Sequence, residues 1–517
     1  MVQKYEIIRN SVIKFAILRS IFKIMREERD ESYSHVLKYT GIFGGVQGIN
    51  ILIGLVRNKA MALLLGAGGM GLSALMTSAQ NFAAQCTSLG ISFGAVPRLS
   101  EYHEHDDDAQ LSFYIQVTRL WSMIAAVLGC IFCVLVSPLI NDLSFAWGNH
   151  TLHYAMLAVS VAVMAIAGGE TAILKATRRL GALAKIQVCS ALISVCVSIA
   201  LYYFFYHSGV VPAIVLTAII TMLTTIAYSY RYYPLRLHFN SSHLKQGAGM
   251  VKLGVAFIVA AAIGSASEMF IRSFLNVEGG LNDVAFYNTA YMISITYAGM
   301  VFSAMETDYF PRLSGVAHDI QATNETVNKQ TEVSLLLLSP MLAALTAMMP
   351  VLIPLLFSKE FLPIVGMAQV AVLAMYFKVL TLPVAYITLA RGHSLSFLFL
   401  ESAYFVVLVL SVVVGYTYWD IYGTGVAIVV AHIFDYLMIY AYAHDRYSYR
   451  STATISRYAI VQLSIGFLAF CLSLLTSGWV YWIAEAALAF VSTAYSIYIL
   501  RQKTHLWEAL RRKLLRI

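Results

Sequence analysis

The chain has 517 residues, of which 59% are hydrophobic and 12% are charged, and its net charge is +8. Soluble domains carry about 25% charged residues, so this composition excludes a soluble globular protein. Repeated apolar runs of about 20 residues predict membrane-spanning helices, and they exclude a β-barrel, whose strands alternate in hydropathy. We therefore predict an all-α polytopic membrane protein.

Residues 1–35 form a basic segment that precedes the first apolar run. Phe15, Leu18 and Phe22 recur along one helical face, and Arg19 and Lys23 flank that face. This pattern predicts an amphipathic helix on the cytoplasmic membrane surface. A disordered basic arm is the alternative.

The apolar runs predict fourteen membrane-spanning helices, numbered here as spans in chain order. Their approximate ranges are 37–65, 70–96, 113–139, 152–174, 183–206, 211–230, 250–274, 284–310, 332–357, 362–390, 394–418, 423–444, 454–476 and 479–500. Lys and Arg gather in alternate loops, for example at Lys175, Arg231 and Arg391. Because cytoplasmic loops carry an excess of these residues, the pattern places both termini in the cytoplasm.

The tetrapeptide Pro-Arg-Leu-Ser occurs at 97–100 and again at 311–314, at the predicted cytoplasmic ends of the second and eighth spans. Two copies six spans apart indicate parallel repeats related by an axis along the membrane normal. We therefore predict two six-helix lobes in a parallel pseudo-repeat. The units are the N-lobe (36–230), a cytoplasmic linker (231–249), the C-lobe (250–444), an extra C-terminal helix pair (453–500) and a basic cytoplasmic tail (501–517).

Polar side chains follow the first two spans at helical spacing. The stripe on the first span consists of Gln47, Asn50, Gly54 and Arg57. Lys59 lies roughly 10 Å inside the end of this span, at about 1.5 Å per residue. The second span carries Asn81 and Gln85 on one face. Such groups are candidates for substrate binding, whereas snorkelling of the two cations and hydrogen bonding between helices are the alternatives.

Two later spans carry further cations inside the bilayer. Arg272 follows Glu268 by four residues, which suits either a self-neutralised pair or a ligand-binding Arg held by a carboxylate. Lys378 lies near the middle of the tenth span, too deep to snorkel easily. We predict that Lys378 is functional, and the alternative is a buried ion pair with Asp435 or Glu401.

Four deep cations (Arg57, Lys59, Arg272 and Lys378) predict a cavity between the lobes that selects an anion, and a phosphate or diphosphate suits Arg and Lys well. Gating or ion coupling is assigned to Arg119, Glu268, Glu306, Asp308 and Asp435. Neither an ATPase motif nor another catalytic signature occurs. The six cysteines lack metal-ligand spacing, so we expect no metal site. We also expect that the protein is not an enzyme, binds no cofactor and has no nucleic-acid partner.

Three stretches resemble the Wzx-type polysaccharide and O-antigen flippases of the multidrug/oligosaccharidyl-lipid/polysaccharide (MOP) exporter superfamily. They are RNKAMALLLGAGGMGLSALMTSAQ, VAFYNTAYMISITYAGMVFSAMETDYFPRLS and LIPLLFSKEFLPIVGMAQVAVLAMYFKVL. The resemblance extends over the first twelve spans, and its motifs are placements of Gly, Pro and Lys.

The resemblance implies a flippase in a bacterial inner membrane. It would move undecaprenyl-diphosphate-linked oligosaccharide repeat units to the outer leaflet by alternating access of two lobes. The family's cationic cavity would map to Arg57, Lys59, Arg272 and Lys378, which would hold the diphosphate. The implied partners are the lipid-linked glycan, membrane lipids, a coupling ion (H⁺ or Na⁺) and other membrane proteins of polysaccharide and lipopolysaccharide assembly.

Two alternatives stay open at this point. Fourteen spans are also the count of the related MurJ lipid II flippases, so export of a peptidoglycan precursor is one alternative. The other is a MATE-type drug or metabolite antiporter, which would use carboxylates inside the membrane for cation coupling. The first span has no acidic residue, which argues against the antiporter.

Overall fold

A computed structural model describes Val46 and residues 48–145, 148–235, 241–297, 299 and 309–503. Within these residues all regular secondary structure is helical, and ten helices are long and apolar enough to cross a membrane. Three of the ten, Gly48–Thr87, Leu180–Tyr232 and Ser394–Tyr447, each contain two predicted spans. The ten helices therefore account for thirteen predicted spans, and the all-helical polytopic fold is confirmed. The predicted amphipathic N-terminal segment and most of the basic tail lie outside the described residues.

The helix Gly48–Thr87 is a hairpin of the first two spans. Arg57 and Thr77 line the same cavity, although a straight helix would separate them by about 30 Å. The chain turns back at Gly66, whose φ of +66° is in the left-handed region that glycine adopts without strain. Leu89 and Gly90 also have positive φ, of 50° and 62°. They end the second span before the predicted limit at 96.

The rest of the N-lobe follows in five longer helices and two helical turns of four residues each. These are α2 (Ile91–Gly94), α3 (Val96–Glu104), α4 (Asp108–Ser144), α5 (Thr151–Ala176), α6 (Leu180–Phe205), η1 (Tyr206–Gly209) and α7 (Val210–Tyr232). The first Pro-Arg-Leu-Ser copy lies in α3, a separate helix, rather than at the end of the second span as predicted.

The C-lobe and the added helix pair complete the fold. Their elements are α8 (Ser241–Glu278), α9 (Leu281–Tyr291), the π-helix η2 (Met292–Tyr297), α11 (Ile320–Leu356), η3 (Lys359–Ile364), α12 (Val365–Ala390), α13 (Ser394–Tyr447), α14 (Ala453–Leu475) and α15 (Gly478–Lys503). α13 breaks at Trp419 and Asp420, which separates the eleventh and twelfth spans. α8 begins at Ser241 rather than at 250, so the end of the predicted linker is helical.

One end of the bundle carries Arg179, Arg231 and Arg391, and we call it the basic end; the opposite end is the far end. At the far end the two lobes share one hydrophobic core, in which Met61 and Leu65 belong to the N-lobe and Phe357 and Phe361 to the C-lobe. At the basic end the two cores are separate, except that Met250 of α8 belongs to the core of the N-lobe. The lobes are thus joined mainly at the far end.

The two basic-end cores preserve the internal repeat. Leu99, from the first Pro-Arg-Leu-Ser copy, is fully buried in the N-lobe core, and Leu313, from the second copy, is fully buried in the C-lobe core. Arg98 and Arg312 beside them are exposed. The repeated tetrapeptide therefore supplies one core leucine and one surface arginine to each lobe.

α8 belongs to the C-lobe by sequence but packs along α4 of the N-lobe as well as against α13. Near the basic end the indole of Trp121 donates to the carbonyl of His243 over 3.4 Å. Near the far end the Ser144 and Ser273 hydroxyls lie 2.8 Å apart, and Asn276 donates to the carbonyl of Ser144 over 2.7 Å. α8 therefore connects the lobes.

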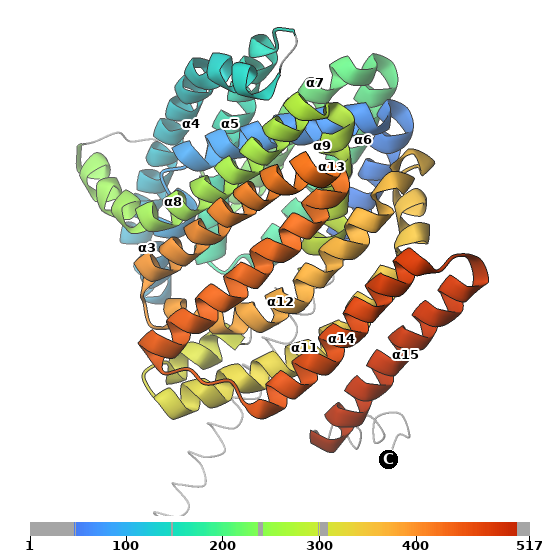
Figure 1. Cartoon of the computed structure of the whole chain (residues 1–517). Coiled ribbons are helices and arrows are strands. Elements are labelled where there is room, and N and C mark those ends of the chain that lie inside the picture. Colours follow the sequence, from blue (N-terminus) through green and yellow to red (C-terminus); the bar gives the residue numbers. More distant parts are fainter. Residues whose placement is uncertain are drawn as a thin grey trace, which may run out of the picture.

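The added pair, α14 and α15, covers one side of the C-lobe beside α11 and α12 (Figure 1). Tyr481 of α15 donates to the carbonyl of Ala347 over 2.8 Å, and Gln369 of α12 donates to the Tyr481 hydroxyl over 3.1 Å. These bonds attach the pair to the C-lobe deep inside the bundle.

Candidate functional site: charged and polar groups inside the membrane

Arg57 points into a cavity of about 300 Å³ that lies inside the N-lobe. Its walls are formed by residues of the first two spans and of α5, α6 and α7, and none of the described C-lobe residues lines it. Arg57 makes no hydrogen bond or ion pair with any residue that the structure describes, and its Nε is buried without a partner. The guanidinium therefore faces the interior of one lobe.

The polar stripe of the first span faces the same interior. Asn50 donates to the side chain of Gln187 on α6 over 3.4 Å. On the second span Thr77 lines the cavity. Asn81 and Gln85 follow Thr77 at four-residue spacing toward the basic end, and both are half-buried. Gln47 lies outside the described residues.

Lys59 lies two residues beyond Arg57 and contacts the other lobe. Its Nζ donates to the carbonyl of Pro354 at the far end of α11 over 3.1 Å. Close by, the carboxylate of Glu360 in η3 accepts from the backbone N–H of Ala67 over 3.1 Å. Ala67 begins the second span, so a carboxylate of the C-lobe caps a helix of the N-lobe, where the helix dipole favours negative charge. We call these two contacts the far-end junction.

Arg272 and Glu268 form the predicted pair on α8, with an N–O distance of 2.9 Å. Arg272 also donates to the side-chain oxygen of Asn288 on α9 over 3.0 Å. Arg272 is buried, whereas Glu268 is half-exposed. The guanidinium is thus neutralised by its own helix and held against the next one.

Lys378 lines a small C-lobe cavity of about 60 Å³ together with Glu401 and Asp435. Its Nζ lies 5.8 Å from the centre of the Tyr404 ring, within the range of a cation–π contact. Asp435 is buried. Both of the predicted partners are therefore near Lys378, and the cavity contains one cation and two carboxyl groups.

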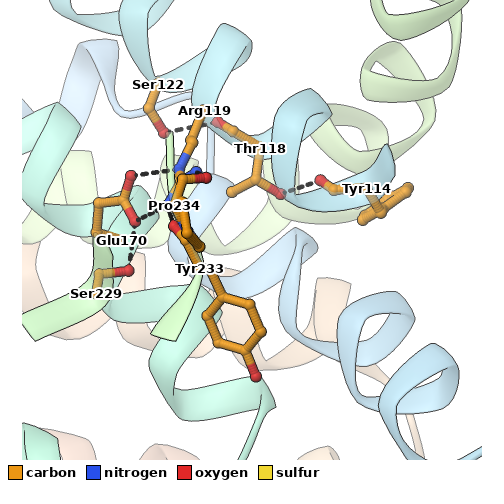
Figure 2. Close-up of polar contacts among 8 residues, drawn as sticks. All are labelled: Tyr114, Thr118, Arg119, Ser122, Glu170, Ser229, Tyr233 and Pro234. Atoms are coloured by element: carbon orange, nitrogen blue, oxygen red, sulfur yellow. Dashed lines mark hydrogen bonds and ion pairs between the residues drawn. The ribbon is translucent and has the colours of Figure 1, made fainter. Parts of the chain in front are cut away.

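Arg119 is buried against Glu170 of α5, to which it donates two hydrogen bonds, of 2.7 and 3.1 Å (Figure 2). It also donates to the carbonyls of Tyr233 and Pro234, where α7 ends and the linker begins. Ser229 donates to the second oxygen of Glu170 over 2.6 Å. Every hydrogen-bonding group of this pair is thus used to hold α4, α5 and the end of α7 together.

The structure therefore distributes the four predicted substrate cations over separate surroundings. Arg57 faces the N-lobe cavity, Lys59 the far-end junction, Arg272 its own carboxylate and Lys378 the C-lobe cavity. Glu306 and Asp308 lie outside the described residues. Within the described residues no group of three or more His, Cys, Asp or Glu side chains could hold a metal ion.

Sequence reasoning missed Glu170 and Glu360, which hold Arg119 and the far-end junction. A signal for Glu170 was present, because a lone carboxylate in the apolar run of the fourth span needs a partner. Glu360 lies in the short loop after the ninth span, outside any apolar run. Its position therefore gave no indication that it needs a partner.

Comparison with known protein families identifies the family of this chain. Residues 60–366, more than half of the chain, match the family described as "Polysaccharide biosynthesis protein". The chain belongs to this family. No curated protein sequence gives a significant match.

Several solved transporters share the fold of this family member. An inward-facing multidrug resistance MATE family transporter of the MOP superfamily aligns with a TM-score of 0.63 and 14% identity, over 77% of this chain and 94% of its own. The lipid II flippase MurJ, in an inward closed conformation, aligns with a TM-score of 0.62 and 12% identity, over 89% and 99%. The eukaryotic MATE transporter AtDTX14 gives a TM-score of 0.56 and 11% identity, over 83% and 99%.

At these identities the likeness establishes the fold. The family and the fold together confirm the predicted resemblance to the Wzx-type flippases of the MOP superfamily. The protein is a multi-pass helical membrane protein of the polysaccharide biosynthesis family.

Proposed function

We propose that the protein is a flippase that moves undecaprenyl-diphosphate-linked oligosaccharide repeat units across a bacterial cytoplasmic membrane by alternating access of its two lobes. Its membership of the polysaccharide biosynthesis family carries the proposal. The fold that it shares with the lipid II flippase supports it, because the same architecture there serves a lipid-linked substrate.

The arrangement of the hydrophobic cores supports alternating access. The lobes share a core at the far end, whereas at the basic end their cores are separate apart from Met250 of α8. If the basic end is cytoplasmic, as the charged loops predict, this conformation receives substrate from the cytoplasm. Release on the other side then requires the far-end junction to open.

Two of the predicted cations lie near the contacts between the lobes and suit the diphosphate. Lys59 bonds to the C-lobe through a carbonyl, so an anion can replace that partner. Arg272 lies on α8, whose neighbouring residue Ser273 contacts the N-lobe. We assign the diphosphate to these two side chains when the far-end junction separates.

The C-lobe cavity suits a coupling ion. One ammonium (Lys378) and two carboxylates (Glu401 and Asp435) leave a formal charge of −1, which a proton or Na⁺ would neutralise. Because α12 and α13 supply all three groups, occupancy of this cavity would change how the two helices pack.

Transport by the purified protein in liposomes tests the proposal. Undecaprenyl-diphosphate-linked glycan is placed in the inner leaflet, and its appearance outside is followed with a lectin. We expect transport of this glycan, weaker transport of lipid II, and no movement of a cationic drug under a proton or Na⁺ gradient. Transport of lipid II alone would instead assign the protein to peptidoglycan export, and transport of the drug alone would make it an antiporter.

A further inference from the structure

The N-lobe cavity carries a positive charge that its walls do not balance. Fourteen of the described residues line the cavity, and none of these fourteen is Asp or Glu. The Arg57 guanidinium finds no partner among the described residues, and Tyr202 beside it is neutral. A guanidinium inside the bilayer without an anion is costly, because low dielectric weakens its solvation.

Two buried arginines elsewhere in the bundle have the counter-ion that half-buried Arg57 lacks among the described residues. Arg119 is paired with Glu170, and Arg272 is paired with Glu268. Even Lys378 shares its cavity with two carboxyl groups. Arg57 alone among these four cations has no carboxylate close to it in the part of the chain that the structure describes, so its counter-ion has to come from outside.

The cavity also offers neutral hydrogen-bond donors. Serine and threonine hydroxyls inside a helix usually donate to the carbonyl four residues earlier, as Thr118 and Thr221 do here. Ser73 and Thr77 line the cavity one turn apart and make no hydrogen bond with the described residues. Their hydroxyls are therefore free to donate toward the cavity.

Size limits what can enter. A cavity of about 300 Å³ holds a small anion with several waters, since a water occupies about 30 Å³ of liquid. It has no room for an oligosaccharide. All of its described lining residues belong to one lobe, so the cavity stays intact when the lobes move relative to each other.

We propose that the N-lobe cavity binds a small inorganic anion from solution, of the chloride class, and that Arg57, Ser73 and Thr77 hold it. This site lies beyond the proposed glycan transport and is separate from the contacts between the lobes. The half-buried amides of Asn81 and Gln85 continue from Thr77 toward the basic end and provide a polar route for the anion.

Thermal unfolding of the purified full-length protein tests the proposal. The midpoint is measured at constant Na⁺ while chloride replaces lactobionate, an anion too bulky for the cavity. We expect the midpoint to rise with chloride and to saturate, because a ligand that binds only the folded state stabilises it. Arg57→Gln should show no rise. Arg178→Gln is the control, since it removes an exposed cation of the same lobe that pairs with Glu104 outside the cavity, and it should respond as the wild type does.

If Arg57→Gln does not fold, a second variant tests the same site. Ser73→Ala with Thr77→Val should raise the apparent dissociation constant for chloride roughly tenfold, because hydrogen bonds to a charged group are lost. A midpoint that is independent of chloride in the wild type, or an Arg57→Gln variant that still responds, would overturn the proposal. So would a response to lipid-linked diphosphate alone, which would make the cavity a headgroup site. Glycan transport is measured separately, so either proposal can fail while the other stands.

Discussion

Arg119 and Glu170 are held at the basic end of the N-lobe by six polar contacts with their surroundings and each other. Their side chains are 5% and 2% exposed, so neither charge is solvated by water. The carbonyls that Arg119 bonds belong to Tyr233 and Pro234, which start the chain between the lobes. Arg119, which was predicted to be a gating residue, therefore attaches the start of the inter-lobe linker to the N-lobe.

Removing one partner of this pair should be strongly destabilising. Glu170→Ala leaves a buried guanidinium uncompensated, and we expect a loss of about 3–5 kcal/mol in the free energy of unfolding. The measurement is denaturant unfolding in detergent. Glu104→Ala is the control, because its pair with Arg178 is 53% and 72% exposed, and such pairs contribute about 0–1 kcal/mol. Equal losses in the two variants would contradict a structural role for the buried pair.

A double variant can show whether Lys378 only neutralises a carboxylate in the C-lobe cavity or takes part in ion coupling. Lys378→Ala leaves Glu401 and Asp435 facing each other across a small cavity, and we expect glycan transport to fall to background while the protein still inserts. A double variant, Lys378→Ala with Asp435→Asn, restores the formal charge of the cavity. If the cluster couples transport to an ion, the double variant also fails in the liposome assay. Recovery of transport would show that Lys378 serves only to neutralise Asp435.

At the scale of elements, α8 joins the lobes through a close backbone contact between Gly90 and Gly254. A Cβ added to Gly254 would lie 2.8 Å from the Cα of Gly90, which is closer than carbon atoms pack. Gly90 itself has a φ of +62°. The turn that ends the second span is therefore also the surface on which α8 rests.

Gly254→Val should push α8 away from the N-lobe. Overpacking of this kind costs about 1–3 kcal/mol, and we expect a lower midpoint of thermal unfolding together with reduced glycan transport. Gly249→Val on the same helix is the matched control, since a Cβ there meets nothing within 4 Å. A similar loss at both positions would point to helix propensity instead of the contact.

The helices themselves were predictable from sequence because each span is an apolar run of fixed minimum length. The ends of the helices were harder to predict. The separate helix α3 depends on the positive φ of Leu89 and Gly90, and the helical part of the linker in α8 depends on packing. The direction of Arg57 could not be predicted, because rotation of a helix about its axis is set by its neighbours. Hydropathy locates a cation along a span but does not say which lobe interior or interface it faces.

For the whole molecule, the distribution of cores determines which end can open. The shared far-end core makes separation there costly in buried apolar area, and the junction adds polar contacts at Lys59 and Glu360. At the basic end the cores are separate apart from Met250 of α8, so rotation of the lobes there exposes less apolar area. The transport cycle that we propose therefore has to break the far-end junction and then re-form it.

Holding that junction closed should stop transport without unfolding the protein. In Ala67→Cys with Glu360→Cys, the new thiols lie on the two residues that now meet across the lobes. A short bifunctional methanethiosulfonate should then link them. We expect the linked protein to lose glycan transport in liposomes and a reducing agent to restore it. The single variants control for reaction at the six native cysteines, and each should transport equally with and without the reagent. Full transport by a completely linked protein would show that the far end does not open, and alternating access of these two lobes would then be ruled out as the mechanism.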